Sequence, residues 1–271
     1  MASTTRKRAL GLAFGLVVAM MAATAHADIT TGLLGWYGFE NDTNDSSGNS
    51  RNGTPTSVTY ATGRVGQAAV FNNVNSAVDV AGLAGVLPGG NSARSVAFWV
   101  NPSSTADNGN MVSWGGAANT QRFSVLMQGG GSLDMIGFFA DRASGTSLTA
   151  NTWTHVVVTY SAGNLQFYVN GALVSSPSVA LNTDASQILR IGVNVAGQNN
   201  EYFGGLIDEV RVYNRVLSTA DVTELFNSTV VAGAPVANTA AVPTLSQWGL
   251  LLTSVLLAGS VYLRRRKPPA L

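Results

Sequence analysis

The residues of this chain that could do chemistry are few, and the densest group is a set of carboxylates near its start. Glu40, Asp42 and Asp45 follow one another at short spacings. Retaining glycoside hydrolysis needs two carboxyl groups about 5 Å apart, so both must project from a rigid strand into one cleft. Here the carboxylates continue out of an apolar segment into Asn, Ser and Gly. We therefore do not expect these residues to share an active face.

Other catalytic groups are equally scarce. The chain has no cysteine, which excludes disulfides, thiolate metal sites and cysteine nucleophiles, and it contains no Gly-x-Ser-x-Gly turn of the hydrolase type. His155 lies in the segment WTHVVVTY, where alternation places it on the same face as Trp153 and Val157. A general base needs an activated partner, so we interpret His155 as a hydrogen-bonded strand residue. The sequence predicts no catalytic residues.

The N-terminal segment has the pattern of an export signal. Residues 6–8 are basic, residues 9–25 are uncharged, and Ala25 and Ala27 supply the small side chains that signal peptidase requires. We expect cleavage after residue 27, so that the mature chain begins at Asp28. A retained anchor helix is the alternative.

The C-terminal segment has the pattern of a membrane anchor. Residues 229–242 are small, uncharged and Pro-bearing, which is typical of a linker. Residues 244–263 are uncharged, and a helix of this length rises about 30 Å, the thickness of a bilayer core. The basic residues 264–267 follow directly, and the positive-inside rule places them in the cytoplasm. We expect the rest of the mature chain outside the inner membrane.

Charge becomes informative once these segments are set aside. Between Asp28 and Glu224 there are eight Arg and no Lys against fourteen acidic residues, a net charge of −6. Binding a phosphate backbone needs a basic face that releases counterions. Nucleic acid is therefore not an expected partner.

The central segment has the pattern of many short antiparallel strands. Apolar or alternating runs are separated by Gly, Asn, Ser and Asp, and Asn170-Gly171 is a strong signal for a type I′ hairpin turn. One helix is expected from Ser218 to Phe226, capped by Ser218. So many strands in about 200 residues indicate an all-β fold with two sheets packed face to face. The expected strands are residues 33–40, 66–72, 76–82, 94–101, 111–115, 122–128, 133–139, 153–160, 165–170, 172–176, 187–193 and 206–213.

The end of the chain resembles the IPTL-CTERM sorting signals of proteobacteria. It combines a Pro-Thr-Leu motif, a Trp-Gly pair, a short hydrophobic helix and a basic cluster, and it departs from the family in having Val242 where Ile is usual. The resemblance implies recognition by an exosortase-type membrane enzyme. The residues that carry the motif are Pro243, Thr244, Leu245, Trp248, Gly249, Arg264, Arg265 and Arg266.

The central segment resembles the laminin G-like family of the concanavalin A-like superfamily. The matching stretches include GRVGQAAVFN, RSVAFWVNP, NTWTHVVVTYSAGNLQFYVNGALVSS and FGGLIDEVRVYNRVLSTADVTELFN, in the order of the family. The resemblance implies a jelly-roll sandwich. The predicted organisation is a signal peptide (1–27), a laminin G-like sandwich (28–228), a linker (229–242) and a sorting signal with a transmembrane helix and basic tail (243–271).

The resemblance also implies a structural Ca²⁺ where the first strand approaches the last long strand. Calcium takes six to eight oxygen ligands. Asp208, Glu40 and Asp45 could supply carboxylates, and Asp208 is the best candidate because it interrupts an apolar run. The alternative is that these residues only form solvated turns.

Loops at one edge of the expected sandwich offer groups of the kind that bind ligands. Trp114 is followed by two glycines, so its ring could form a stacking platform, whereas its alternative role is to close the core. Asn199, Asn200 and Tyr202 offer hydrogen-bonding groups that would suit a sugar.

These observations favour an exported, non-catalytic adhesion or recognition module that binds an extracellular glycan or protein ligand. A structural envelope or biofilm-matrix protein is the alternative, and a carbohydrate-active enzyme is a third and weaker hypothesis. The expected location is the inner membrane or, after processing of the C-terminal segment, the cell surface or the extracellular space.

Overall fold

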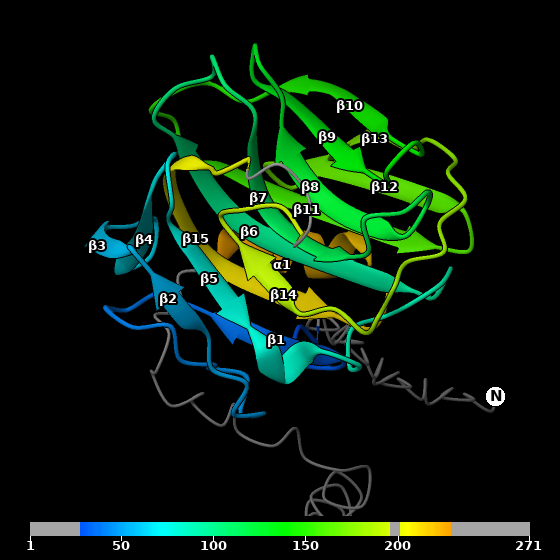
Figure 1. The fold of residues 1–271 in the computed structure, drawn as a ribbon, viewed down its shortest axis with the longest axis horizontal. Helices are drawn as coiled ribbons and strands as arrows, with labels where there is room; N and C mark the ends of the chain where they lie inside the picture. The colour runs from blue at the N-terminus through cyan, green and yellow to red at the C-terminus, as the bar shows by residue number, and fades with distance from the viewer. Residues whose placement is uncertain (1–27, 196–200, 229–271) are drawn as a thin grey trace, which may run out of the picture.

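The protein is a sandwich of two antiparallel β-sheets (Figure 1). The structure, a computed structural model, describes residues 28–195 and 201–228. In sheet A the order is β13-β12-β11-β6-β15-β4-β3, with β1 also paired to β15, and in sheet B it is β10-β9-β8-β7-β14-β5-β2. The expected all-β sandwich is confirmed.

Sheet A consists of β1 (Leu33–Tyr37), β3 (Thr59–Thr62), β4 (Gln67–Asn72), β6 (Arg94–Pro102), β11 (Thr154–Ser161), β12 (Asn164–Val169), β13 (Ala172–Ser175) and β15 (Gly204–Tyr213). Sheet B consists of β2 (Thr54–Thr56), β5 (Ala77–Val80), β7 (Gly109–Gly115), β8 (Arg122–Met127), β9 (Ser132–Ile136), β10 (Arg142–Ser147) and β14 (Leu189–Ile191).

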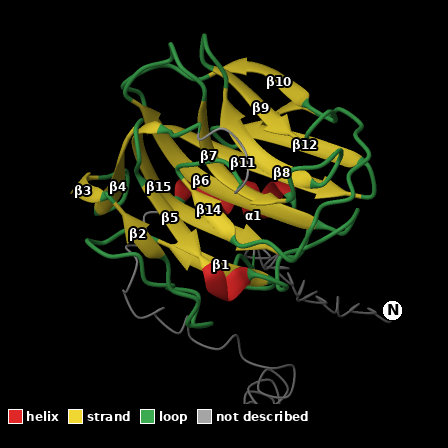
Figure 2. Cartoon of the chain, viewed as in Figure 1, coloured by secondary structure: helices red, strands yellow, loops and turns green. Residues whose placement is uncertain are grey.

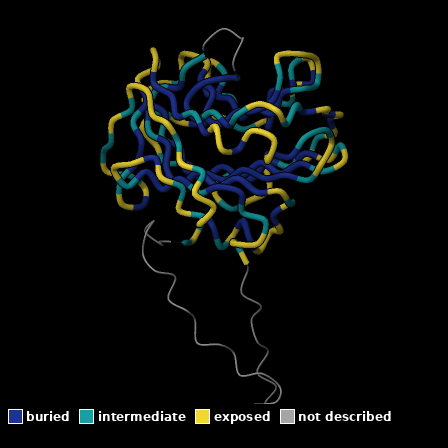
Figure 3. The backbone as a smooth tube through the Cα atoms, turned by 60° about the horizontal axis from the view of Figure 1, so that its bottom comes forward, coloured by how far each residue is buried: buried dark blue, intermediate teal, exposed yellow. Residues whose placement is uncertain are grey.

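The core lies between the two sheets and follows from the alternation along their strands. Val96, Phe98 and Val100 of β6 point inward from sheet A, and Phe123 and Val125 of β8 point inward from sheet B. All five side chains are fully buried. Figure 3 shows these buried layers inside a periphery of exposed loops. Burial of this apolar surface is the main stabilising contribution.

A helix covers part of the outer face of sheet A (Figure 2). Helix α1 (Thr219–Asn227) begins with a complete capping box, in which Ser218 accepts from the N–H of Asp221 and the Asp221 carboxylate accepts from the N–H of Ser218. Its Val222 and Leu225 pack against a small apolar cluster on the sheet. The expected helix and its cap are therefore confirmed.

The predicted hairpin is also confirmed. Strands β11, β12 and β13 form a meander, and Asn170 and Gly171 between β12 and β13 have φ angles of +49° and +82°. These are the left-handed conformations that a type I′ turn requires.

Three strands were not predicted, and several predicted strands, β9 among them, end earlier than expected. The unpredicted strands β2 and β3 lie at sheet edges, and β10 lies at the other edge of sheet B. They are largely polar or exposed, so they lack the apolar face that marks a half-buried strand. Strand β9 ends at Ile136, because Phe138 and Phe139 both have positive φ angles.

The expected signal peptide and C-terminal helix lie outside the described residues. Within residues 28–195 and 201–228, no helix combines the length and hydrophobicity needed to cross a bilayer.

The buried histidine beneath helix α1 should make stability depend on pH. His155 is 2% exposed, and its ring lies 5.0 Å from that of Trp99 and 5.9 Å from that of Phe226. Burial, together with the smaller effect of the positive charges of Arg211 and Arg64, lowers the pKa of His155 to about 3. Because the unfolded chain binds this proton near pH 6.5 and the folded chain does not, the free energy of unfolding falls as the pH falls from about 6.5 towards 3.

We expect His155→Gln to remove this pH dependence. The stability advantage of the wild type over the variant should shrink by up to about 1.4 kcal/mol per pH unit between pH 6 and pH 4. Urea unfolding of both proteins across this range measures the difference, in which all other titrating groups cancel. Parallel stability curves would show that His155 does not titrate on unfolding.

Candidate ligand-binding and metal sites

Two carboxylates hold the loop that joins β3 to β4. Asp208 of β15 is fully buried, and its Oδ2 accepts hydrogen bonds from the N–H groups of Arg64 and Val65, both at 2.9 Å. Glu40 accepts a hydrogen bond from the N–H of Gln67 at 3.1 Å. The structure therefore brings Glu40 and Asp208, two of the three predicted calcium ligands, to the backbone of one loop.

Each of these carboxylates keeps one oxygen that could bind a cation. Within the described part of the chain, Oδ1 of Asp208 and Oε1 of Glu40 are buried and have no hydrogen-bond partner. The pKa of Asp208 is raised to about 7, chiefly by burial; the hydrogen bonds from the loop N–H groups lower it, and the neighbouring Glu209 raises it. A cation bound at Asp208 would favour the ionised form of this carboxylate.

The third predicted ligand, Asp45, does not join this group. Its Oδ1 accepts from the N–H groups of Trp36 and Ser47, and its Oδ2 accepts from the N–H of Arg51. This carboxylate stabilises a turn. Across the described residues, no group of three or more His, Asp or Glu side chains is arranged to hold a metal ion. Any calcium here would depend on Glu40, Asp208 and backbone carbonyl groups.

Calcium binding stays a prediction, and it can be measured as a stability shift. If Glu40 and Asp208 bind Ca²⁺, the melting temperature at pH 8 should be several degrees higher in about 5 mM calcium than in EDTA, because a ligand that binds only the folded state stabilises it. The shift should disappear in Glu40→Gln. It should persist in Asp45→Asn, a control variant in the neighbouring turn. An equal melting temperature of the wild type with calcium and with EDTA would contradict the prediction.

Trp114 is a core residue and not a stacking platform. It is fully buried, its ring lies 4.5 Å from that of Phe123, and its indole N–H donates to the carbonyl of Pro88 at 3.4 Å. It shares a face of β7 with Val112, and this face points into the sandwich. The expectation of an exposed ring was wrong because alternation along the strand continues up to the glycines.

Polar side chains on the outer face of sheet B hold the loop that joins β14 to β15. The Asn110 amide donates to Oε2 of Glu201 at 2.9 Å, and its backbone N–H donates to the carbonyl of Glu201 at 3.3 Å. Ser113 donates to the carbonyl of Val193 at 2.8 Å. The described ends of this loop are therefore fixed on the sheet. Of the predicted ligand-binding residues here, Tyr202 is half-buried.

Asn199 and Asn200, the other two predicted residues of this loop, lie outside the described residues.

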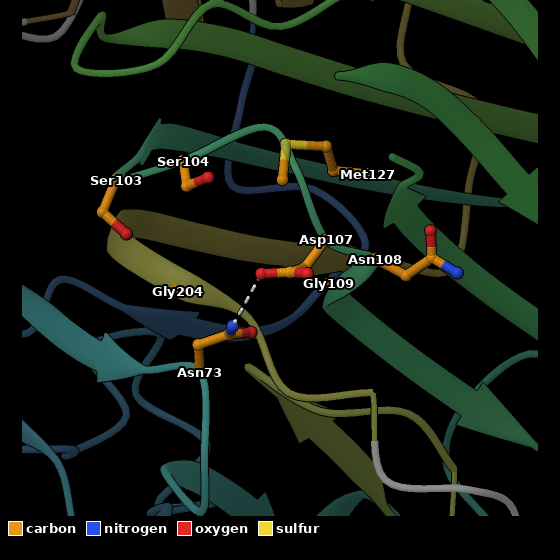
Figure 4. A pocket seen from close by; sticks show the side chains of 8 residues that line it. All are labelled: Asn73, Ser103, Ser104, Asp107, Asn108, Gly109, Met127 and Gly204. Carbon is orange, nitrogen blue, oxygen red and sulfur yellow. Dashed lines mark hydrogen bonds between the residues drawn. The ribbon is translucent and has the colours of Figure 1, made fainter. Parts of the chain in front are cut away.

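Two hollows on the surface of the described residues differ in volume. The first lies between the loop that follows β6 and the start of β15, where Asn73 donates to Asp107 at 3.3 Å (Figure 4). Its volume of about 20 Å³ suits a single water molecule. The second is an open groove of about 380 Å³ lined in part by Arg142, Asn164 and Ser178. Only the second reaches the size of a small-ligand site.

The structure also reveals a polar and aromatic cluster that sequence reasoning missed. Arg122 of β8 lies with its guanidinium carbon 5.3 Å from the ring centroid of Phe138, and the Phe138 ring lies 5.1 Å from that of Phe139. Phe139 is 83% exposed. The sequence signal was a Phe-Phe pair at the end of an apolar run, which alternation alone assigns to a strand.

The fold defines a member of the concanavalin A-like class of β-sandwiches. The profile of the Concanavalin A-like lectin/glucanases superfamily matches residues 71–223, more than half of the chain, so the protein belongs to this family. The IPTL-CTERM motif matches residues 240–267. Both sequence resemblances are confirmed.

Known proteins with similar sequences or structures include several binding domains. Domain 4 of the extracellular arabinanase AbnA from Geobacillus stearothermophilus, solved in complex with arabinotriose, is 28% identical with a TM-score of 0.59, covering 71% of this chain and 97% of that one. The binding domain of Paraclostridial Mosquitocidal Protein 1 shares the fold, with 22% identity, a TM-score of 0.60 and coverage of 74% and 53%.

A curated relative is the adhesion G-protein coupled receptor V1 of Danio rerio. It is 28% identical over 147 residues, which are 49% of this chain and 2% of the receptor. The chain therefore spans only a small part of this relative.

Proposed function

We propose that the protein is an exported, non-catalytic module that binds an extracellular glycan or protein ligand through loops of its sandwich. The single observation that carries this proposal is the way in which strand side chains hold loop backbones. Asn110 and Ser113 fix the loop between β14 and β15, and Asp208 fixes the loop between β3 and β4. Loops held on a rigid frame bind ligands with little loss of conformational entropy.

The carboxylates of the chain support binding better than hydrolysis. Both carboxylate oxygens of Asp45 accept hydrogen bonds from backbone N–H groups, and one oxygen each of Asp208 and Glu40 does the same. A hydrolase would need two carboxyl groups facing one cleft. Domain 4 of the arabinanase AbnA, which is 28% identical to this chain and was solved in complex with arabinotriose, supports the same proposal.

The two ends of the chain support export and retention at the cell envelope. Residues 1–27 have the pattern of a signal peptide, and the matched IPTL-CTERM motif contains the Pro-Thr-Leu sequence, the Trp-Gly pair and the basic cluster. We infer that the protein crosses the inner membrane and is anchored there or released to the surface after processing by an exosortase-type enzyme.

Binding of the full-length protein to an immobilised glycan array, in mild detergent, tests this function. We expect selective binding to a subset of extracellular polysaccharides, without any release of shortened products. Asn110→Ala should weaken this binding severalfold, because it frees the loop at Glu201. Thr223→Ala, on the exposed side of α1, is the matched control and should bind normally. Product release would instead support an enzyme.

A structural matrix protein is the second candidate, and one edge strand favours it. Strand β13 ends sheet A and exposes Leu173 and Val174, at 52% and 39%. An exposed apolar edge strand can pair with another chain. Concentration-dependent assembly without ligand in sedimentation, together with a silent glycan array, would favour this alternative over the binding module.

A further inference from the structure

We propose that the open groove beside the turn between β11 and β12 is a subsite for a neutral oligosaccharide, with Asn164 and Ser178 as the side chains that bind its hydroxyl groups. The inference rests on the proposed binding function. It gives that function a second contact surface, separate from the loop between β14 and β15.

The groove lies where the edge strands of the two sheets come together. Strand β10 ends sheet B and β13 ends sheet A, and the two strands are in contact at this end of the sandwich (Figure 1). The lining residues come from the start of β10, the turn between β11 and β12, and the segment that follows β13. The volume of about 380 Å³ lies within the range of sites that bind small ligands, so a short oligosaccharide can enter.

Hydrogen bonds across the groove hold its walls in place. Nε of Arg142 donates to the carbonyl of Ser178 at 2.8 Å, and Nη1 of Arg142 donates to the carbonyl of Asp141 at 2.7 Å. The N–H of Val179 donates to the carbonyl of Gly163 at 2.8 Å. A ligand therefore meets walls that are already ordered, and its binding costs little conformational entropy of the protein.

Two polar side chains that line the groove are available to a ligand. Asn164 and Ser178 are exposed, and within the described part of the chain neither side chain takes part in a hydrogen bond. A carboxamide and a hydroxyl group can each donate and accept hydrogen bonds. Sugar hydroxyl groups also do both, so these two side chains match the chemistry of a glycan.

The turn beside the groove keeps a small residue in a strained conformation. Ala162 and Gly163 have φ angles of +48° and +94°, as in a type I′ turn, and the corresponding first position of the next hairpin is Asn170 at +49°. Asn adopts this conformation far more readily than Ala. Ala162 is exposed and lines the groove, so core packing does not explain the small residue. A small side chain here keeps the groove open.

The backbone around the groove suits a glycan better than a peptide. An extended peptide binds by pairing with an unpaired strand edge. Here the N–H of Leu165 donates to the carbonyl of Pro177 at 3.1 Å, and Val179 is paired with Gly163, so the start of β12 already pairs with the segment after β13. Recognition of a glycan by side chains needs no unpaired backbone.

The charges favour a neutral glycan over an acidic one. Among the described residues that line the groove, Arg142 is the one ionisable residue, and two of its N–H groups already donate to carbonyls. The segment from Asp28 to Glu224 has a net charge of −6, so the general field of the domain repels a polyanion. A neutral chain avoids this repulsion.

Calorimetry with neutral trisaccharides tests the proposal on the full-length protein in mild detergent. The probes are the linear trimers of arabinose, xylose, mannose and glucose, and we expect at least one of them to bind. Asn164→Ala combined with Ser178→Ala should weaken this binding about tenfold, because the ligand loses two hydrogen bonds. The melting temperature should change little, because neither side chain has a hydrogen bond within the described fold.

Ala162→Asn separates the stability of the turn from the function of the groove. It should raise the melting temperature by about 1–3 °C, because Asn relieves the backbone strain. It should also weaken trisaccharide binding severalfold, because a longer side chain takes up space in the groove. A more stable variant with unchanged affinity would overturn the proposal.

Two controls keep the test specific. Thr59→Ala combined with Thr62→Ala removes two exposed polar side chains from β3, at the opposite edge of sheet A, and should bind like the wild type. Asn110→Ala acts on the loop between β14 and β15, and it should leave the affinity for the trisaccharide unchanged.

The proposal is also overturned if none of the neutral trimers binds, if the variant lacking Asn164 and Ser178 binds like the wild type, or if acidic oligosaccharides alone bind. Trisaccharide binding that is weakened by Asn110→Ala and not by the groove variant would place the site at the loop between β14 and β15. That result would leave the proposed function intact and remove the groove assignment, whereas a silent glycan array would remove both.

Discussion

Buried polar side chains must find hydrogen-bond partners, and in this protein many of those partners are the backbones of loops. Asp208 accepts from the loop between β3 and β4, and Ser113 donates to the loop between β14 and β15. Ser95 donates to the carbonyl of Arg215 and accepts from the N–H of Leu217, which fixes the entry to α1. Because an unpaired buried polar group is costly, each of these strands dictates where a loop lies.

Because of this constraint, the sheets and the loops of the domain have different roles. The sheets provide the apolar core and present polar groups at chosen positions, and the loops that those groups hold form the surface available to a ligand. The same framework supports a binding role without requiring a catalytic cleft. Some buried polar atoms have no hydrogen-bond partner among the described residues, including Oδ1 of Asp208, Oε1 of Glu40 and two nitrogens of Arg122.

Alternation and turn chemistry were sufficient to predict the sandwich from sequence, as the Asn170-Gly171 hairpin illustrates. Edge strands such as β10 were not predicted, because neither face of these strands is regularly buried and their sequences therefore lack apolar alternation. The binding residues were harder to predict. The burial of Trp114 is not evident from the sequence, because the glycines that follow it suggest a loop. Asp45 and Glu40 are close in sequence, which suggests a shared site, but their carboxylates bind different parts of the backbone. The contact between Arg122 and Phe138 could not be predicted, since it exists only in the folded chain.

Amide hydrogen exchange at the loop between β3 and β4 tests the central claim most directly. If Asp208 holds this loop, the N–H groups of Arg64 and Val65 should exchange slowly, far below the rate of an open turn. In Asp208→Ala both should lose most of their protection, while the amide of Val158 in the core of sheet A stays protected. Fast exchange of Arg64 and Val65 in the wild type, or unchanged protection in the variant, would contradict the account.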